Sequence, residues 1–257
     1  MDIVVCIKRV PQTAEAEVKI DSSGKDILKD RLTFDINESD NYALEEAILL
    51  KEKFGGTVTL ISLGEQETED VLRMGIAKGA DAAVRITDEK FTGMDGMAIA
   101  ETLAPVIKSI HFDMVITGCI STDAGYSQVG PVLAELLGIP HATLVSKMEV
   151  EGDRVKAQRE LEGGLLESVD IKLPAVITLQ TGINEPRYAS LPAIRRAASK
   201  EIKVVSGKEL GIESPNSKTK IEILFAPPVG KRAEIIAGSA DEASTKLVGI
   251  FKDKGLL

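Results

Sequence analysis

The stretch ITGCISTDAGYSQVGPVLAELLG, residues 116–138, begins as a strand and ends as a helix. Its first residues are apolar, its middle holds small and polar residues, and Pro131 suits the first turn of a helix. In an open α/β sheet such a turn lies at the carboxyl edge, where helix N-termini present free amides and a positive dipole end. The stretch predicts a turn that suits a phosphate or pyrophosphate, although small residues here can also be plain turn chemistry.

Three more strand and helix pairs precede this stretch. Apolar runs predict strands at residues 2–7, 57–62, 82–86 and 113–118. Between them, helical spacing predicts one helix that is capped by Ser39 or Asp40 and ends at Gly55, one that ends at Gly79, and one over residues 96–110 that Pro105 kinks or shortens. We therefore expect the α/β class, with an open doubly wound, mostly parallel sheet of the flavodoxin-like or Rossmann-like kind.

The apolar positions of the helices predict which faces pack on the sheet. The expected inward residues are Ala43, Ala47, Leu50, Phe54, Val71, Leu72, Gly75, Ile76, Ile99, Leu103, Val106, Ile107, Val132, Leu133, Leu136 and Leu137.

The chain changes texture after Pro140. Two strand-rich segments with a hairpin at residues 151–153 predict a β extension on the sheet. From about residue 206 the sequence is polar and rich in turn residues, so this tail should not add to the core, and a final amphipathic helix spans roughly 239–251. We expect a nucleotide-binding domain at 1–205 and a C-terminal arm at 206–257 that packs on a partner, or else folds back on its own domain.

Composition excludes several classes of function. The 257 residues carry 31 basic and 40 acidic side chains, a net charge of −9, which favours neither nucleic acid nor an anionic membrane as a partner. No segment resembles a signal peptide or a membrane span, so a cytoplasmic location, or an organelle matrix, is expected. The only two cysteines, Cys6 and Cys119, lie in apolar runs and are interpreted as buried fillers rather than a disulfide or metal site.

Motifs for conventional catalysis are missing from the sequence. There is no GxxxxGK[ST] loop, no GxGxxG after the first strand and no GxSxG elbow, and the two histidines, His111 and His141, merely flank apolar segments. A hydrolase or an ordinary dinucleotide dehydrogenase is therefore disfavoured. Asp123 could repel a phosphate or instead bind a hydroxyl or a backbone amide, and the residues leave this open.

The second half of the chain resembles a known family. RELEGGLLE at 159–167 and KLPAVITLQTGINEPRYASLPAIRRA at 172–197 are similar to the signature region of the electron-transfer flavoprotein beta subunit. The segments CIKRVP, FDINESDNYALEEAILLKEK, MGIAKGAD and SQVGPVLAELLG follow the same family in the same order, so the resemblance covers the whole chain.

The resemblance implies an electron carrier rather than a conventional enzyme. The family forms a heterodimer with a larger alpha subunit that holds most of a FAD, and the beta subunit buries an AMP. The implied AMP residues are Cys6, Asn37, Leu63, Asp123, Ser127, Gln128, Val129 and Gly130, with Val129 standing where many members have threonine. Some members place a second FAD in the AMP site and bifurcate electrons from NADH, and this alternative stays open. The sequence names neither the donor, the acceptor nor the flavin potentials.

Two further groups of residues take their roles from the resemblance. Arg159 and Glu160 would approach the interface FAD, where the positive charge of Arg159 favours a negatively charged form of the flavin. The segment NEPRYASLP resembles a loop that docks on flavin-dependent dehydrogenases such as acyl-CoA dehydrogenase. There Leu191 is the anchor, accompanied by Arg187, Tyr188 and Arg195, unless Leu191 is a core residue between two prolines. Without the resemblance, a nucleotide-sensing α/β module with no redox role would be the competing interpretation.

Overall fold

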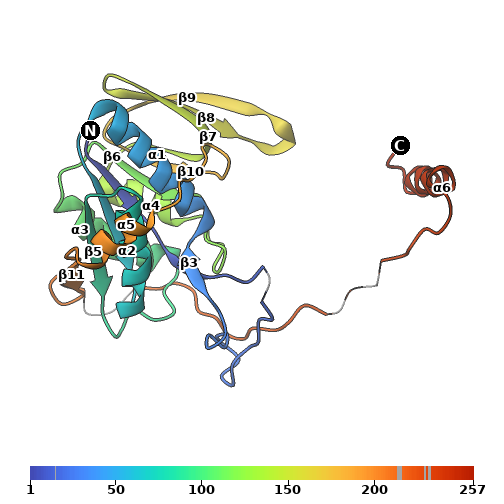
Figure 1. The fold of residues 1–257 in the computed structure, drawn as a ribbon, viewed down its shortest axis with the longest axis horizontal. Helices are drawn as coiled ribbons and strands as arrows, with labels where there is room; N and C mark the ends of the chain where they lie inside the picture. Colours follow the sequence, from blue (N-terminus) through green and yellow to red (C-terminus); the bar gives the residue numbers. More distant parts are fainter. Residues whose placement is uncertain (15, 213–215, 229, 231–232) are drawn as a thin grey trace. The chain divides into compact units, whose positions relative to one another are not determined.

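The computed structural model describes residues 1–14, 16–212, 216–228, 230 and 233–257 (Figure 1). The chain forms two compact units, Met1–Ile223 and Leu224–Leu257. The first unit contains the sheet with its flanking helices, and the second contains helix α6 (Ala240–Asp253). In the described part of the chain, no helix is long and apolar enough to span a membrane.

A nine-stranded sheet organises the first unit. Its strands, in spatial order, are β11 (Lys203–Ser206), β5 (Ala82–Thr87), β4 (Val58–Leu63), β1 (Ile3–Cys6), β6 (Met114–Gly118), β10 (Ala175–Leu179), β7 (His141–Glu151), β8 (Arg154–Glu160) and β9 (Leu166–Lys172). Pairing is parallel from β11 to β7 and antiparallel from β7 to β9. The predicted doubly wound sheet and its β extension are confirmed. A separate small sheet pairs β2 (Arg9–Pro11) with β3 (Phe34–Ile36).

Helices cover both faces of the parallel part. One core cluster joins the sheet to α1 (Glu38–Phe54), α2 (Glu69–Lys78) and α5 (Leu191–Ala198), and the other joins it to α3 (Gly96–Lys108) and α4 (Val129–Leu137). Successive side chains of a strand point to opposite faces of the sheet, so both faces are apolar. In β1, Ile3 and Val5 belong to the first cluster, whereas Val4 and Cys6 belong to the second. Short 3₁₀ turns, η1 (Gln66–Thr68) and η2 (Glu162–Gly164), complete the elements.

The first helix ends at Gly55, as expected, but its start and the burial of its last residue differ from the expectation. Its N-cap is Asn37, whereas Ser39 and Asp40 lie inside the first turn, buried, with their side chains bonded to other segments instead of capping. Phe54 was expected to be buried but is 42% exposed, because the helix ends at this residue. The other predicted inward positions of this helix, Ala43, Ala47 and Leu50, are buried.

Helix α4 begins at Val129, two residues before the expected start. Its buried face is Gly130, Leu133 and Ala134, because the helix approaches the sheet most closely at Gly130 and the residues one turn later share that face. Val132, Leu136 and Leu137, which were expected to be buried, are partly buried against the same core cluster. In α3, Leu103, Val106 and Ile107 are buried, and Pro105 lies within a helix that continues to Lys108.

The chain after residue 198 holds an edge strand that the sequence did not predict, and the tail from about residue 206 makes contacts with the core that its polar sequence did not predict. β11 adds a parallel edge strand beside β5, and Leu210 packs against the core. Further on, the carboxylate of Asp95 accepts hydrogen bonds from the backbone N–H of Lys218 at 2.6 Å and of Thr219 at 2.9 Å. A buried acceptor at the start of α3 therefore fastens a stretch that was expected to lie free of the core.

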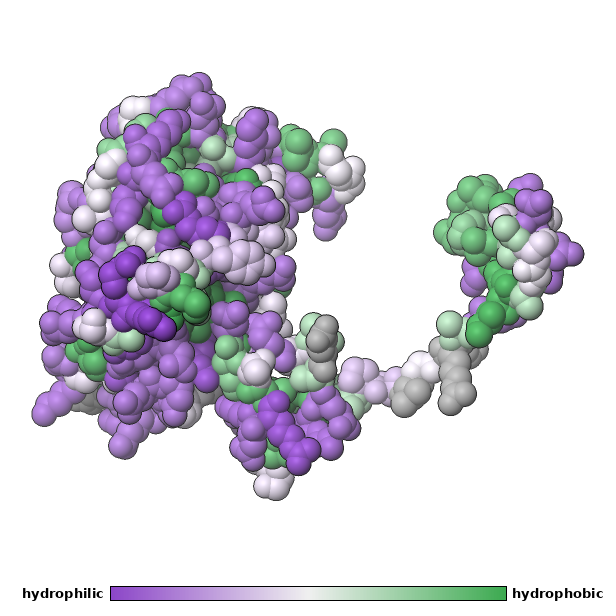
Figure 2. Space-filling view, in the orientation of Figure 1, coloured by the Kyte–Doolittle hydropathy of each residue, from purple (hydrophilic) through white to green (hydrophobic). Residues whose placement is uncertain are grey.

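The second unit consists of connecting chain and one amphipathic helix. Ser239 caps α6 through a capping box with Glu242, which explains why the helix begins where the sequence predicted. Figure 2 shows hydrophobic residues gathered on one side of this unit and hydrophilic residues on the other. The exposed apolar residues of α6 are Leu247, Val248, Ile250 and Phe251. Such a stripe is typical of a helix that packs on another surface.

Candidate functional site

A pocket lies at the carboxyl ends of three neighbouring strands. It is lined by residues at or just after the ends of β1, β4 and β6, together with the turn and first residues of α4, and it has a volume of about 790 Å³, open mouth included. Because the strand order reverses around β1, this is the switch point where doubly wound sheets bind ligands. Its lining includes Cys6, Lys8, Asn37, Asp40, Ser62, Leu63, Ser127, Gln128, Val129 and Gly130.

The N-terminus of α4 forms one wall of the pocket. Gln128 is the N-cap, so the first-turn amides of Val129 and Gly130 have no acceptor within the helix, and Pro131 has no N–H. Gly130 allows this approach: a Cβ there would overlap Cγ2 of Thr178 on β10. Ser127 holds a left-handed φ of 51°, which is rare for a residue with a side chain and marks a tightly determined turn. The turn is built to present backbone amides to an anion.

The N-terminus of α1 braces the opposite end of this turn. Asn37 donates from Nδ2 to the carbonyl of Ile120 at 2.8 Å and accepts at Oδ1 from the N–H of Thr122 at 3.0 Å. The hydroxyl of Ser39 donates to the same Ile120 carbonyl at 2.7 Å. Two side chains of one helix therefore hold the segment that follows β6. Asn37 contributes to the pocket by shaping it as well as by lining it.

Asp40 joins two strand ends at the base of the pocket. Its carboxylate accepts from the backbone N–H of Lys8 at 2.8 Å and of Gly118 at 3.0 Å. A side chain at position 118 would overlap both Ser39 and Asp40, so glycine is required at this contact. Burial raises the pKa of Asp40 to about 7 against the opposing effect of these hydrogen bonds. This buried carboxyl therefore changes charge near neutral pH.

A salt bridge links the two sides of the pocket mouth. Nζ of Lys8, which follows β1, lies 2.6 Å from Oδ2 of Asp123 in the turn after β6. Burial alone would raise the pKa of the Asp123 carboxyl, but the hydrogen bond and charge of Lys8 outweigh it and lower that pKa. Asp123 is therefore a paired carboxylate beside the pocket, and its charge is offset by Lys8.

Ser62 offers a buried polar atom that fits a ligand. Its Oγ is buried, lines the pocket, and has no hydrogen-bond partner among the described residues. Such an orphaned hydroxyl is uncommon in a folded protein and suits a polar group of a bound molecule. Cys6 also lines the pocket, and burial raises the pKa of its thiol to about 12, so its side chain is uncharged. Both Cys6 and Cys119 are free.

Most of the expected AMP residues meet in this one pocket. Lys8, Asp40 and Ser62 were not expected there, because the strand pattern marks where a strand ends but not which neighbouring side chains turn inward. A sequence signal existed only for Lys8, as the first charge after an apolar strand.

Arg159 and Glu160 lie elsewhere, at the end of β8 in the β extension. The Arg159 guanidinium donates to the carbonyl of Thr143 at 2.8 Å and to Glu167 at 2.6 Å, so its charge is already partnered within this chain. Glu160 is exposed. The turn that follows exposes the apolar side chains of Leu165 and Leu166. These residues form a surface that is separate from the pocket lining.

The loop at residues 180–190 connects β10 to α5 and presents an apolar projection. Tyr188 is 99% exposed and Leu191, the first residue of α5, is 73% exposed. The interpretation of Leu191 as a core residue is therefore wrong. Arg195 is exposed in the last turn of α5, whereas Arg187 lies against α1 and binds Glu45 and Glu52. Three of the four expected docking residues, Tyr188, Leu191 and Arg195, are thus exposed, whereas Arg187 is bound to α1.

Fold and pocket define an α/β protein of the doubly wound class with a cavity at its switch point, where such folds bind ligands. The family model described as "Electron transfer flavoprotein domain" matches residues 27–210. The chain is 38% identical over 259 residues to the electron transfer flavoprotein subunit beta of Clostridium acetobutylicum, covering 99% of each chain. It is also 38% identical to the subunit of that name from Methylophilus methylotrophus, covering 98% of each chain, and 36% identical to Protein FixA of Azotobacter vinelandii, covering 92% of this chain and 88% of that one. The chain belongs to the electron transfer flavoprotein family and is of its beta-subunit type.

Proposed function

We propose that this chain is one half of a two-chain electron shuttle and that its pocket holds AMP. The observation that carries the nucleotide assignment is the pocket at the switch point, which is lined both by the first turn of α4 and by a buried Ser62 hydroxyl that has no hydrogen-bond partner in the described part of the chain. A helix N-terminus favours a phosphate, and the apolar walls suit a flat base.

Different residues of the pocket would bind the phosphate, offset its charge and hold the pocket in shape. Backbone amides of Val129 and Gly130 would bind the phosphate, so the absence of a threonine hydroxyl at position 129 removes one contact but not the site. Lys8 would add positive charge, shared with Asp123, and the pairing supports a site in which Asp123 does not repel the phosphate. Asn37 and Asp40 would keep the turn and the strand ends in register.

The redox centre of the shuttle would lie outside this pocket. We place a FAD at the seam with a larger alpha subunit, beside Arg159 and Glu160 and the exposed leucines of the following turn. The flavin supplies the capacity to accept electrons from a dehydrogenase and to pass them to a further acceptor. The arm that ends in α6 would pack its apolar stripe on the same partner. Such a shuttle would work in the cytoplasm, or in the mitochondrial matrix of a eukaryote.

Cofactor counting tests the proposal directly. The chain, co-expressed with its alpha subunit and purified as a pair, should release one AMP and one FAD per heterodimer on denaturation, measured by chromatography and absorbance. Two flavins and no AMP would contradict the AMP assignment and indicate a second FAD in the pocket, with NADH oxidation as the accompanying activity. A pair without flavin would contradict the electron-shuttle assignment itself.

Leu191→Ala should weaken reduction of the pair by a dehydrogenase. An exposed leucine projecting beside Tyr188 is suited to fill an apolar pocket of a partner, and truncating such an anchor costs about tenfold or more in affinity. With a cognate acyl-CoA dehydrogenase as donor, the KM for the shuttle should rise about tenfold.

The matched control is Ile194→Ala, one turn further along α5, where the side chain is less exposed. The FAD and AMP content of both variants should equal that of the unmodified pair. An unchanged KM in Leu191→Ala would remove the docking role from this loop.

A further inference from the structure

The 180–190 loop is fastened to α1 through two of its own side chains. Among the described residues, the hydrogen bonds that hold residues 181–189 run through Asn184 and Arg187. Asn184 donates from Nδ2 to the carbonyl of Tyr42 at 3.1 Å and to Glu46 at 3.0 Å. The polar attachments of the loop therefore run through these two residues to a neighbouring helix and not through a backbone ladder, and Ile183 adds an apolar contact with the core.

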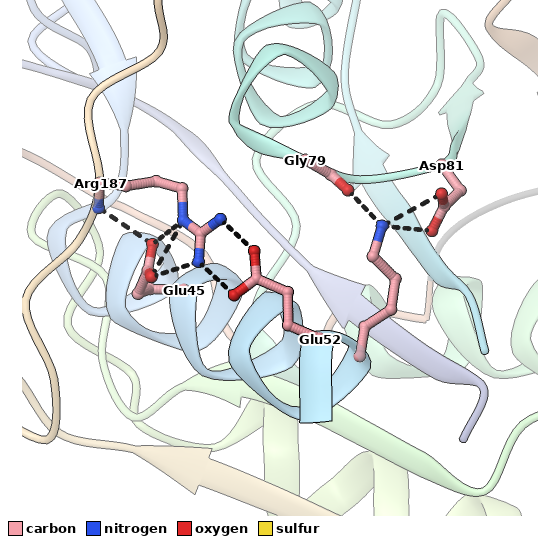
Figure 3. A network of polar contacts seen from close by, with 6 residues as sticks. Glu45, Glu52, Gly79, Asp81 and Arg187 are labelled. Atoms are coloured by element: carbon pink, nitrogen blue, oxygen red, sulfur yellow. Dashed lines mark hydrogen bonds and ion pairs between the residues drawn. The ribbon is translucent and has the colours of Figure 1, made fainter. Parts of the chain in front are cut away.

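Arg187 makes the strongest of these attachments (Figure 3). Its backbone N–H and its guanidinium both bind Glu45, at 2.9 Å from N and from Nη2, and the guanidinium also binds Glu52 at 2.6 Å from Nη1. Figure 3 shows the guanidinium lying between these two carboxylates of α1. Glu52 and Glu45 raise the pKa of Arg187 above its ordinary range. A planar fork that meets two carboxylates fixes direction as well as distance.

One of the residues that Arg187 binds is buried, whereas the residue that follows Arg187 in the loop is exposed. The Glu45 side chain that Arg187 binds is only 6% exposed, whereas the residue after Arg187 in the loop, Tyr188, is 99% exposed. One residue of the loop is thus locked to the helix and its neighbour is presented to solvent. Lys51, on the same helix, donates to the carbonyl of Gly79 and to Asp81, so it does not compete for these carboxylates.

We propose that Arg187 is a positioning residue, which holds the 180–190 loop in the shape that projects Tyr188 and Leu191 before any partner arrives. This inference rests on the proposed docking role of Leu191. A preformed loop loses less conformational entropy on binding, so weak and rapid encounters become productive without a larger interface. Arg187 would then contribute through loop geometry and not as a positive charge on the docking rim, since two carboxylates of its own chain already offset that charge.

We call the attachment of Arg187 to Glu45 and Glu52 the Arg187 latch. Cleavage by chymotrypsin tests this latch without a docking dehydrogenase. Tyr188 is exposed, yet a protease needs the surrounding loop to open locally, so cleavage after Tyr188 reports the population of the open loop. In the heterodimer, Arg187→Ala and Glu52→Gln should accelerate this cleavage, the former about tenfold, as measured from fragment masses over time. Arg195→Ala, which removes an exposed arginine of α5, should leave the rate unchanged. Equal rates in all variants would overturn the latch.

Docking measurements distinguish a positioning role of Arg187 from a role as a surface charge, because the two roles predict opposite effects of Glu52→Gln on the affinity for the dehydrogenase. If Arg187 acted as a rim charge, removing a carboxylate beside it would strengthen docking on an acidic surface; if it positions the loop, the same change weakens docking. With the cognate acyl-CoA dehydrogenase as donor, we expect KM to rise in Glu52→Gln and about fivefold to tenfold in Arg187→Ala, with kcat unchanged at saturation. A lowered KM in Glu52→Gln, or faster cleavage with an unchanged KM, would overturn the positioning role.

A third variant guards against misfolding. Arg187→Ala leaves the buried Glu45 without its partner, so the double variant Glu45→Gln/Arg187→Gln removes both charges together and should retain the heterodimer and its flavin. It should show the same raised cleavage rate and KM. Leu191→Ala keeps the two hypotheses apart: if it raises KM while the Arg187 variants do not, only the latch fails, and if it has no effect, the docking role of the loop fails.

Discussion

Gly130→Ala should abolish nucleotide retention and destabilise the first unit. The new Cβ would overlap Cγ2 of Thr178, so α4 must move away from the sheet and take its first-turn amides out of position. Overpacking of this kind costs about 1–3 kcal/mol of unfolding free energy. Loss of aligned charge-assisted hydrogen bonds to a phosphate should lower AMP affinity about a hundredfold. Calorimetric titration with AMP and urea unfolding measure the two effects.

A second-site change provides the control for this prediction. Thr178→Ser removes the overlapping methyl group but keeps the hydroxyl that accepts a hydrogen bond from the N–H of Leu144 at 3.1 Å. The double variant Gly130→Ala/Thr178→Ser should therefore recover most of the affinity and stability. Gly249→Ala, in α6, adds a Cβ that meets no atom within contact distance and lies outside the pocket lining, so it should leave the AMP affinity unchanged. If Gly130→Ala bound AMP normally, the amides of α4 would not be the phosphate site.

Asp40 should make the protein less stable as pH rises from about 4 to 7. Its pKa is about 7 in the folded chain and close to its ordinary 3.8 when unfolded, so over this interval the folded state binds the extra proton. Stability is then highest below the unfolded pKa and is lost as pH rises through the folded pKa. At about 1.4 kcal/mol per pH unit, the loss reaches about 4 kcal/mol.

Asp40→Asn should flatten this slope, which urea unfolding at intervals between pH 4 and 7.5 would measure. In the described part of the chain, Lys8 and the thiols of Cys6 and Cys119 interact with Asp40, and neither thiol titrates in this interval because burial raises its pKa. Glu46, whose pKa burial also raises, contributes a slope of the same sign, so Glu46→Gln serves as the comparison. An unchanged slope in Asp40→Asn would show that this carboxyl is ionised throughout.

The pattern of the chain predicted the sheet because a parallel core imposes a local signature. Buried strands such as β1 must be apolar on both faces, and the helices between them must repeat at helical spacing. The hairpin between β7 and β8 was also predictable, because its turn needs a residue with positive φ and the sequence places Gly152 there. The sequence did not predict the edge strand β11 or the helix α5. Each is short and largely exposed, so its few buried residues do not make an apolar pattern long enough to indicate a strand or a helix.

Sequence alone determined the parts of this protein that depend on local physics: the doubly wound sheet, the small-residue turn before α4 and the resemblance that names its family. Only the tertiary structure decided what meets across distance. It brought Asp40 of α1 to the strand ends at Lys8 and Gly118, paired Lys8 with Asp123, and tied Arg187 to Glu45. The physical reason is that a partner more than thirty positions away is chosen by the packing of whole elements, which leaves no periodicity or spacing in the chain.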